Sequence, residues 1–403
     1  MASKFSSVMR SIEKVFMKLA VCGLPNQKRL QRIGDSVMKL SVTDYSFHMR
    51  PNDDTKSWHE HRENQISVAN LAKLGKEYGI ERLMTSTSWV PDEYKLGVTC
   101  PKNTKEDPLE VNDEQIAQCV KALCGICWIF YGPHEAQKFL NDLKLDVITT
   151  KPVIEDSKNG AYPKIADKIY NKMEFNKLET AIGYSFNDKF LLIQAFTHHS
   201  YKHSSIIGNF QPLEFCGDAV LDYLTNECFF EYGIFYNHKM SRDLRSSLIS
   251  NDTFHGLAAD FKLDMYFIHG FKNFNRQKYF QNPKNLADLF ESLIAAVYLD
   301  SRKSLFETRK VFFKLLGPLL DKVLLDLSLK PIQELKKNHK IRNMKQRVNK
   351  DYLFVYVFVD DIKKPFTGYG TSILNAELDA ATKALNHFKE LDKTREKVEE
   401  IKD

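Results

Sequence analysis

The feature that most limits how this chain can fold is one helical motif that occurs twice, roughly 180 residues apart. The segment Arg29-Leu-Gln-Arg-Ile-Gly-Asp-Ser-Val37 has the pattern of Leu213-Glu-Phe-Cys-Gly-Asp-Ala-Val220. Farther along each copy, Ile116-Ala-Gln-Cys-Val-Lys-Ala-Leu-Cys-Gly125 parallels Leu286-Ala-Asp-Leu-Phe-Glu-Ser-Leu-Ile-Ala295. These segments carry apolar residues at helical spacing and contain no proline, so the sequence predicts two copies of one helical domain.

The second copy places four carboxylates on two of these helices. Glu214 and Asp218 are four residues apart, and Asp288 and Glu291 are three apart, so each pair lies on one helix face. Unpaired buried carboxylates are costly, which argues against a purely structural role in otherwise apolar helices. Carboxylate oxygens bind hard cations, so the pattern indicates a site for Mg²⁺, with Mn²⁺ as a substitute. Such ions can activate water and stabilise the leaving oxygen in phosphodiester hydrolysis.

The first copy has lost most of this acidic set. The four positions that correspond to the carboxylates hold, in the same order, Gln31, Asp35, Gln118 and Lys121. Lys121 brings a cation to the place where a metal is expected, and the formal charge of the set falls from about −4 to near zero. We therefore expect this former site to be catalytically inactive.

Together these motifs resemble the ribonuclease III family. Both acidic runs occur in the order typical of the family, and Gln194-Ala-Phe-Thr-His-His-Ser-Tyr201 is similar to its opening helix and turn. The resemblance implies double-stranded RNA as the substrate, bound through phosphates and 2′-hydroxyls, and products with 5′-phosphate and 3′-hydroxyl ends. It implies that Lys284, which Glu114 replaces in the first copy, steadies a phosphate. The metal ligands that it implies are Glu214, Asp218, Asp288 and Glu291.

Two such domains in one chain resemble the Dicer-like members of the family, with a Drosha-like processing nuclease as the alternative. Asn70-Leu-Ala-Lys-Leu-Gly75 and Trp89-Val-Pro-Asp-Glu-Tyr94 favour the Dicer-like interpretation. Domains of this family work in pairs, so we expect the two copies of a monomer to pair with each other and to cut with a single site. A dimer in which second copies pair across chains is the competing arrangement. A non-catalytic RNA-binding scaffold is the main functional alternative.

The last part of the chain has a different pattern, which resembles a double-stranded-RNA-binding domain. A short helix from Pro331 is followed by alternating segments around Tyr352–Val359 and Ile362–Tyr369, and a final helix is expected over Ser372–Leu391. The expected order is α-β-β-β-α.

This C-terminal domain departs from the family at the helix start where lysines usually grip phosphates. Ile373, Leu374 and Glu377 stand at those positions, so strong RNA binding there is not expected. Other lysines are candidates for a weaker, displaced contact, and they are Lys336, Lys337, Lys340, Lys363 and Lys364.

The predicted fold class is therefore mainly α, with two ribonuclease III domains as an intramolecular pseudo-dimer and one small α+β domain. The expected divisions are a connector helix at 1–22, the degenerate domain at 23–150, a linker at 151–172, the active domain at 173–329, the RNA-binding-like domain at 330–392 and a charged tail at 393–403.

The composition of the chain indicates which partners and which cellular compartment to expect. The net charge of +6 is compatible with a polyanionic partner but does not require one. Seven cysteines without a signal peptide indicate a reducing compartment, and no apolar run could cross a membrane, so a cytoplasmic or nuclear protein is expected. A double-stranded-RNA-binding protein is a candidate partner. Cys124-Gly-Ile-Cys127 and the pair His59 and His61 are more typical of helix packing than of metal binding.

Overall fold

The computed structural model describes residues 25–84, 111–147, 162–231, 244–349, 352–360, 362–370 and 373–399. The expected connector helix at 1–22 and the segment 89–94 lie outside these ranges. The chain divides into two compact units, one formed by residues 1–230 and 238–314 and the other by 231–237 and 315–403. Among the described helices, none combines the length and the apolar character needed to span a bilayer.

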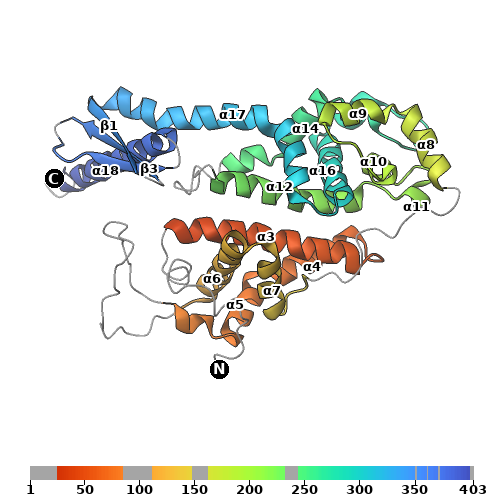
Figure 1. Ribbon diagram of the computed structural model, residues 1–403, viewed down its shortest axis with the longest axis horizontal. Helices are drawn as coiled ribbons and strands as arrows, with labels where there is room; N and C mark the ends of the chain where they lie inside the picture. The colour runs from red at the N-terminus through yellow and green to blue at the C-terminus, as the bar shows by residue number, and fades with distance from the viewer. Residues whose placement is uncertain are drawn as a thin grey trace. The chain divides into compact units, whose positions relative to one another are not determined.

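The first copy of the repeat is a helical bundle in the first unit, with one long helix, α3, and several shorter ones (Figure 1). Local capping explains several of its boundaries: Asn112 and Gln115 form a reciprocal capping box at the start of α6, and Ser67 caps α5. The helices are α3 (Pro25–Met49), α4 (Thr55–Ile66), α5 (Val68–Glu77), η2 (Ile80–Leu83), α6 (Asp113–Ile126), η3 (Cys127–Tyr131) and α7 (Pro133–Asp142).

The second copy repeats this plan with two long, largely buried helices at its centre. Its helices are α8 (Tyr162–Lys172), α9 (Phe175–Ile182), α10 (Lys189–Ala195), α11 (Ser204–Ile207), α12 (Gln211–Glu231), α14 (Asn251–Asp260), η5 (Leu263–Tyr266), α15 (Arg276–Phe280) and α16 (Pro283–Asp300). Ser250 caps α14 as Ser67 caps α5, which extends the correspondence between the copies.

In each copy two central helices cross at a glycine. A Cβ on Gly217 of α12 would lie 1.9 Å from the carbonyl oxygen of Glu291 in α16, and one on Gly34 of α3 would lie 1.7 Å from the carbonyl oxygen of Lys121 in α6. Only glycine allows this approach. The crossing fixes which residues face each other across the helix pair, so Glu291 and Lys121 occupy equivalent places.

The two copies contact each other within the first unit. Lys303 of the second copy forms a 2.6 Å ion pair with Asp44 of the first. Trp128 donates its indole N–H to the hydroxyl of Tyr223 at 2.8 Å, and the ring of Trp58 packs against Phe215 at 5.5 Å between centroids. These contacts join copies of one chain, as the expected intramolecular pseudo-dimer requires.

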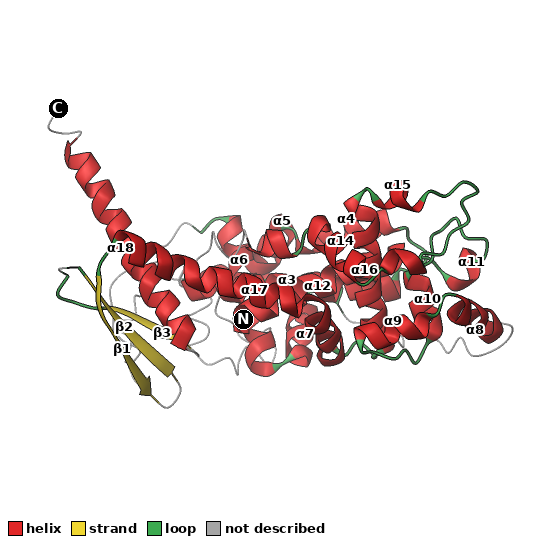
Figure 2. Ribbon diagram, turned by 90° about the horizontal axis from the view of Figure 1, so that it is seen from above, coloured by secondary structure: helices red, strands yellow, loops and turns green. Residues whose placement is uncertain are grey.

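The second unit contains a three-stranded antiparallel sheet in the order β1-β2-β3, packed with helix α18 (Figure 2). Its elements are the end of α17 (Leu305–Asn338), β1 (Ile341–Asn349), β2 (Tyr352–Val359), β3 (Phe366–Gly370) and α18 (Ile373–Glu399). Alternate residues of β2, including Val355 and Val357, are buried against alanines of α18, so the core lies between sheet and helix. The α-β-β-β-α order and the mainly helical fold class are confirmed.

The elements differ from the sequence pattern in four places. The short helix expected from Pro331 is instead the last part of one continuous helix, α17, whose Ile332 and Leu335 are buried in the core of the second unit. Part of the segment expected as a linker is helix α8, because apolar residues at helical spacing allow it to bury Ala166. Strand β1 is rich in polar residues and lacks a clear alternation of apolar and polar positions. It forms a strand because it pairs with β2. The final helix also runs past Leu391 to Glu399.

Replacing Gly34 by alanine should destabilise the first unit by about 2 kcal/mol or more, because the new methyl group would force α3 and α6 apart. Gly256 is a matched control: it lies in α14, and a Cβ there meets nothing within 4 Å. Gly256→Ala should be neutral or stabilising by about 0.5–1 kcal/mol. Urea denaturation checks both changes, and equal effects would contradict the close crossing.

Candidate metal centre

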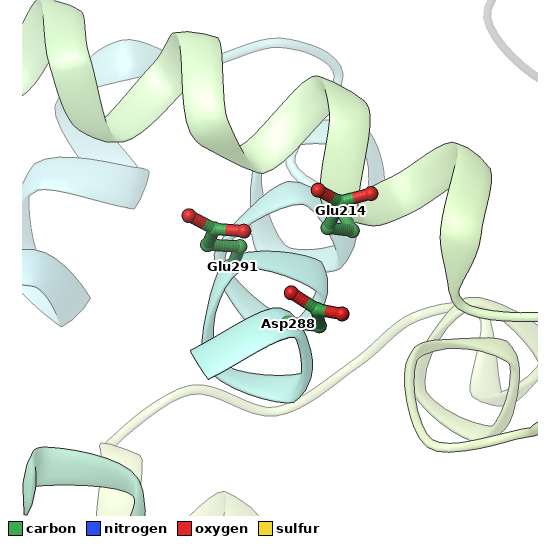
Figure 3. Close-up of side chains that lie close together, drawn as sticks. All are labelled: Glu214, Asp288 and Glu291. Carbon is green, nitrogen blue, oxygen red and sulfur yellow. The ribbon is translucent and has the colours of Figure 1, made fainter. Parts of the chain in front are cut away.

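Three carboxylates meet where α12 and α16 cross. Glu214 projects from α12 and Asp288 and Glu291 from α16, and their side chains point toward a common space (Figure 3). One carboxylate oxygen from each lies within 4.8 Å of the others, and within the described ranges no other His, Cys, Asp or Glu group gathers in this way. Three hard oxygen donors at this spacing fit a divalent cation such as Mg²⁺.

The three carboxylates repel one another in a poorly solvated place. Burial and the neighbouring charge of Asp288 raise the pKa of Glu214 to about 7. Burial, followed by the charges of Asp218, Glu214 and Asp288, raises the pKa of Glu291 well above its usual value, and burial raises that of Asp288. A divalent cation would relieve both the repulsion and the lost solvation, so the electrostatics of the cluster fit a bound metal.

Lys284 is the cation of the second copy that lies beside this cluster. Its ammonium group lies 2.9 Å from Asp288 and 4.0 Å from Glu214. Although burial alone would lower the pKa of Lys284, its hydrogen bond to Asp288 and the surrounding carboxylates raise it. The amine thus stays protonated at the edge of the cluster, where it can face an anionic ligand.

Asp218 stands apart from the three-carboxylate cluster. Its two oxygens are bound by residues of the first copy: Lys39 lies 2.9 Å from Oδ1, and Arg62 lies 3.2 Å from Oδ2. These cations outweigh the effect of burial and hold the pKa of Asp218 below its usual value. The structure therefore brings together three of the four expected ligands, and pairs the fourth with cations.

The corresponding place in the first copy carries an internal ion pair. Lys121 lies 2.6 Å from Asp35, and Gln118 donates to Glu114 at 3.2 Å. In the second copy the equivalents of Glu114 and Gln118 are Lys284 and Asp288, so a glutamate and a neutral glutamine replace the ion pair at the start of the helix. With Gln31 as the remaining member, this set holds one carboxylate, already neutralised by an ammonium group.

The weaker motifs have structural roles. Cys124 and Cys127 are fully buried, and burial raises the pKa of both thiols. His61 hydrogen-bonds Asp146 at 3.0 Å, and His59 packs edge-on against Phe215. Within the described part of the chain, neither pair belongs to a cluster of three or more potential metal ligands.

The lysines proposed as RNA contacts lie at the surface of the second unit. They lie in two segments that Asp360 helps to join, since its carboxylate accepts from the backbone N–H of Lys340 at 2.7 Å and contacts His339 at 2.8 Å. The exposed side chains are Lys336, Lys337, Lys340, Lys363 and Lys364.

Sequence reasoning missed Lys39 and Arg62, although a signal for Lys39 was present. Counting from the shared Gly-Asp of the two copies, Lys39 falls at the position of Asp222. The signal is this exchange of an aspartate for a lysine one turn after the shared Gly-Asp; in the structure Lys39 contacts Asp218 of the other copy, whereas Asp222 pairs with Arg245 of its own.

The sequence profile of the "Ribonuclease III domain" family matches residues 28–132, and that of the "Ribonuclease-III-like" family matches residues 188–318. The chain is similar to the endoribonuclease dcr-1 of Caenorhabditis elegans, 27% identical over 91% of this chain and 26% of that protein. It is also similar to the endoribonuclease Dicer of Danio rerio, 30% identical over 75% of this chain and 19% of that protein. The chain thus spans about a quarter or less of these relatives.

Among solved structures, Dicer from Giardia intestinalis aligns with 74% of this chain and 55% of its own, at 13% identity and a TM-score of 0.47.

The raised pKa of Glu214 predicts that the metal-free protein loses stability as the pH rises. The folded protein holds a proton that the unfolded chain releases from about pH 4.5 upward, and the loss is complete above the folded-state pKa of about 7. The free energy of unfolding should fall by up to about 3 kcal/mol across this range. Urea denaturation in a chelator at pH 5 and pH 8 measures the fall.

Glu214→Gln is the matched variant, because glutamine has the same shape and does not titrate. Its stability should fall less between the two pH values than that of the parent, and Mg²⁺ should reduce the fall in the parent. A fall of the same size in both proteins would show that Glu214 does not carry the effect.

Proposed function

Because the chain belongs to the ribonuclease III family and is Dicer-like, we propose that it is a Mg²⁺-dependent endoribonuclease that cuts double-stranded RNA with a single site. The observation that carries the proposal is the cluster of Glu214, Asp288 and Glu291, which combines hard oxygen ligands with unsatisfied negative charge. Its members come from two crossing helices of the second copy, so the fold itself assembles them.

Each group at the site has a chemical task in this proposal. Glu214, Asp288 and Glu291 hold Mg²⁺ in their ionised form, and Asp218 supports the site from the neighbouring turn of α12. When bound, the metal supplies an activated water and stabilisation of the departing 3′-oxygen. Lys284, at the edge of the cluster, binds the phosphate oxygens beside the scissile bond. Products would carry 5′-phosphate and 3′-hydroxyl ends.

Recognition of the duplex would depend on shape more than on base sequence. An A-form helix offers phosphates and 2′-hydroxyls across its wide minor groove, and protein contacts to them carry little sequence information. Basic residues of the second unit, including Lys336 and Lys363, are candidates for such phosphate contacts. Binding should weaken steeply as the salt concentration rises.

We further propose that the first copy does not cut. An ammonium group, that of Lys121, already neutralises Asp35 at 2.6 Å, and the equivalent positions otherwise hold glutamines. A cation would have to displace this ammonium group, and the four equivalent positions offer it no second carboxylate. The first copy would instead complete the RNA-binding surface of a monomer by pairing with the second, a pairing that the Lys303–Asp44 contact supports.

Asp288→Asn should lower the rate of Mg²⁺-dependent duplex cleavage by about a hundredfold or more, because a cluster ligand loses its charge. Asp35→Asn is the matched control, with the same chemical change at the equivalent helix pair of the first copy, and should cut like the parent. The assay uses a labelled duplex and the full chain. If parent and Asp288→Asn are equally inactive, the protein is a non-catalytic RNA-binding scaffold.

A single working site also predicts the cutting pattern. With each strand of a duplex labelled separately, a monomeric chain should cut one strand per binding event, and nicked duplex should precede any doubly cut product. A denaturing gel over a time course, with the mass of the protein measured in parallel, reads this out. Simultaneous cutting of both strands by the monomer would reject the single-site proposal, whereas paired cuts by a dimer would favour pairing of second copies across chains.

A further inference from the structure

The carboxylate of Asp218 belongs to the second copy, yet both of its oxygens are bound by the first. Lys39 of α3 reaches Oδ1 at 2.9 Å, and Arg62 of α4 reaches Oδ2 at 3.2 Å. Asp218 follows Glu214 by one helical turn, so these two cations of the non-cutting copy lie next to the acidic cluster.

Arg62 is held firmly in this place. Its side chain is 9% exposed, donates to the hydroxyl of Thr43 at 3.1 Å, and lies over the ring of Phe215 at 4.5 Å. Phe215 is the neighbour of Glu214 in sequence. A guanidinium group fixed by a hydrogen bond, an aromatic ring and an ion pair has few other conformations open to it, so it can hold Asp218 in one position.

Comparison of the two copies shows why Lys39 and Arg62 bind a carboxylate of the second copy and not one of their own. Arg62 and Arg245 stand at equivalent positions, each five residues before the serine that caps the next helix. In the second copy Arg245 pairs within its own copy, donating its Nε to Asp222 at 2.9 Å. The residue equivalent to Asp222 in the first copy is Lys39, which cannot accept from an arginine. Arg62 is therefore available to the other copy, and Lys39 adds a second cation.

We infer that Lys39 and Arg62 are positioning residues for the active site of the second copy. They fix the carboxylate of Asp218 and thereby the turn of α12 that presents Glu214 to the cluster, and they also offset one negative charge beside it. The inference rests on the proposed function for its catalytic consequence, but the contacts themselves do not. It gives the first copy a part in the chemistry although its own carboxylates are lost.

A second ion pair between the copies provides a control, because it contributes to the contact between the copies but lies outside the acidic cluster. Lys303 and Asp44 are as close, at 2.6 Å, and both side chains are largely buried, but neither is a member of the acidic cluster. Loss of this pair should weaken the contact between copies without changing the cluster. Lys303→Met is therefore the matched control for Lys39→Met and Arg62→Met.

The first measurement is the affinity of the full chain for Mn²⁺ without RNA. Electron paramagnetic resonance detects the Mn²⁺ that stays free in solution. Removing a cation beside the cluster makes its potential more negative, so Lys39→Met and Arg62→Met should each bind Mn²⁺ about threefold to tenfold more tightly than the parent. Lys303→Met should bind like the parent, and Arg62→Lys should restore parental affinity. Thermal denaturation confirms that each variant is folded.

The second measurement is the cleavage rate at saturating Mg²⁺. Lys39→Met and Arg62→Met should lower kcat about tenfold or more with little change in KM, because the position of Asp218 is lost while the RNA-binding surface is kept. If both variants bind Mn²⁺ like the parent and lose no more turnover than Lys303→Met, the positioning role is wrong. If the parent does not cleave but the Mn²⁺ affinities follow the expected order, the proposed activity fails, while the effect of Lys39 and Arg62 on the acidic cluster stands.

Discussion

The close crossing of two helices at a glycine is the constraint on which the acidic cluster depends. Because Gly217 has no side chain, α12 lies directly against the carbonyl of Glu291, and Glu214 is carried to the two carboxylates of α16. The same crossing at Gly34 carries Lys121 to Asp35 in the first copy. One backbone arrangement thus produces a concentrated negative charge in one copy and a neutral ion pair in the other. The helix crossing brings these positions close together, and the side chains at them determine the local charge.

The contact between the copies is both apolar and ionic. Aromatic rings such as Trp58 and Phe215 bury surface, which supplies most of the stabilisation available to such a contact. The ionic contacts add direction, because an unpaired buried charge is costly and each lysine or arginine must meet its carboxylate. A copy that no longer needs metal ligands can therefore still be required for the geometry of its partner. This is consistent with the proposal that the first copy, with one of the four acidic residues, still contributes to the site of the second.

Much of the fold followed from helical spacing and from the repeat, while the details at the site did not. The long helices carrying Glu214 and Asp288 were evident because their apolar periodicity is strong and no proline interrupts it. The separation of Asp218 from the cluster could not be predicted, because helical spacing shows which residues share a face but not which side chains bind them. Lys39 and Arg62 come from another copy, and their reach depends on tertiary packing. Strand β1 was equally hard to see, since its sequence is polar and its partner strand defines it.

The ion pair of Lys121 with Asp35 has a consequence for how the two halves of the first unit respond to their surroundings. An ammonium group on a side chain is a counterion that cannot diffuse away, so the first half carries its own charge compensation at any ionic composition. In the second half Lys284 pairs with Asp288, and Lys39 and Arg62 pair with Asp218, so only the charge that remains on Glu214 and Glu291 must be balanced from solution. When divalent ions are scarce, the second half should be the less rigid of the two, because its clustered carboxylates still repel one another. The first half should keep the same structure, because its ion pair does not depend on dissolved ions.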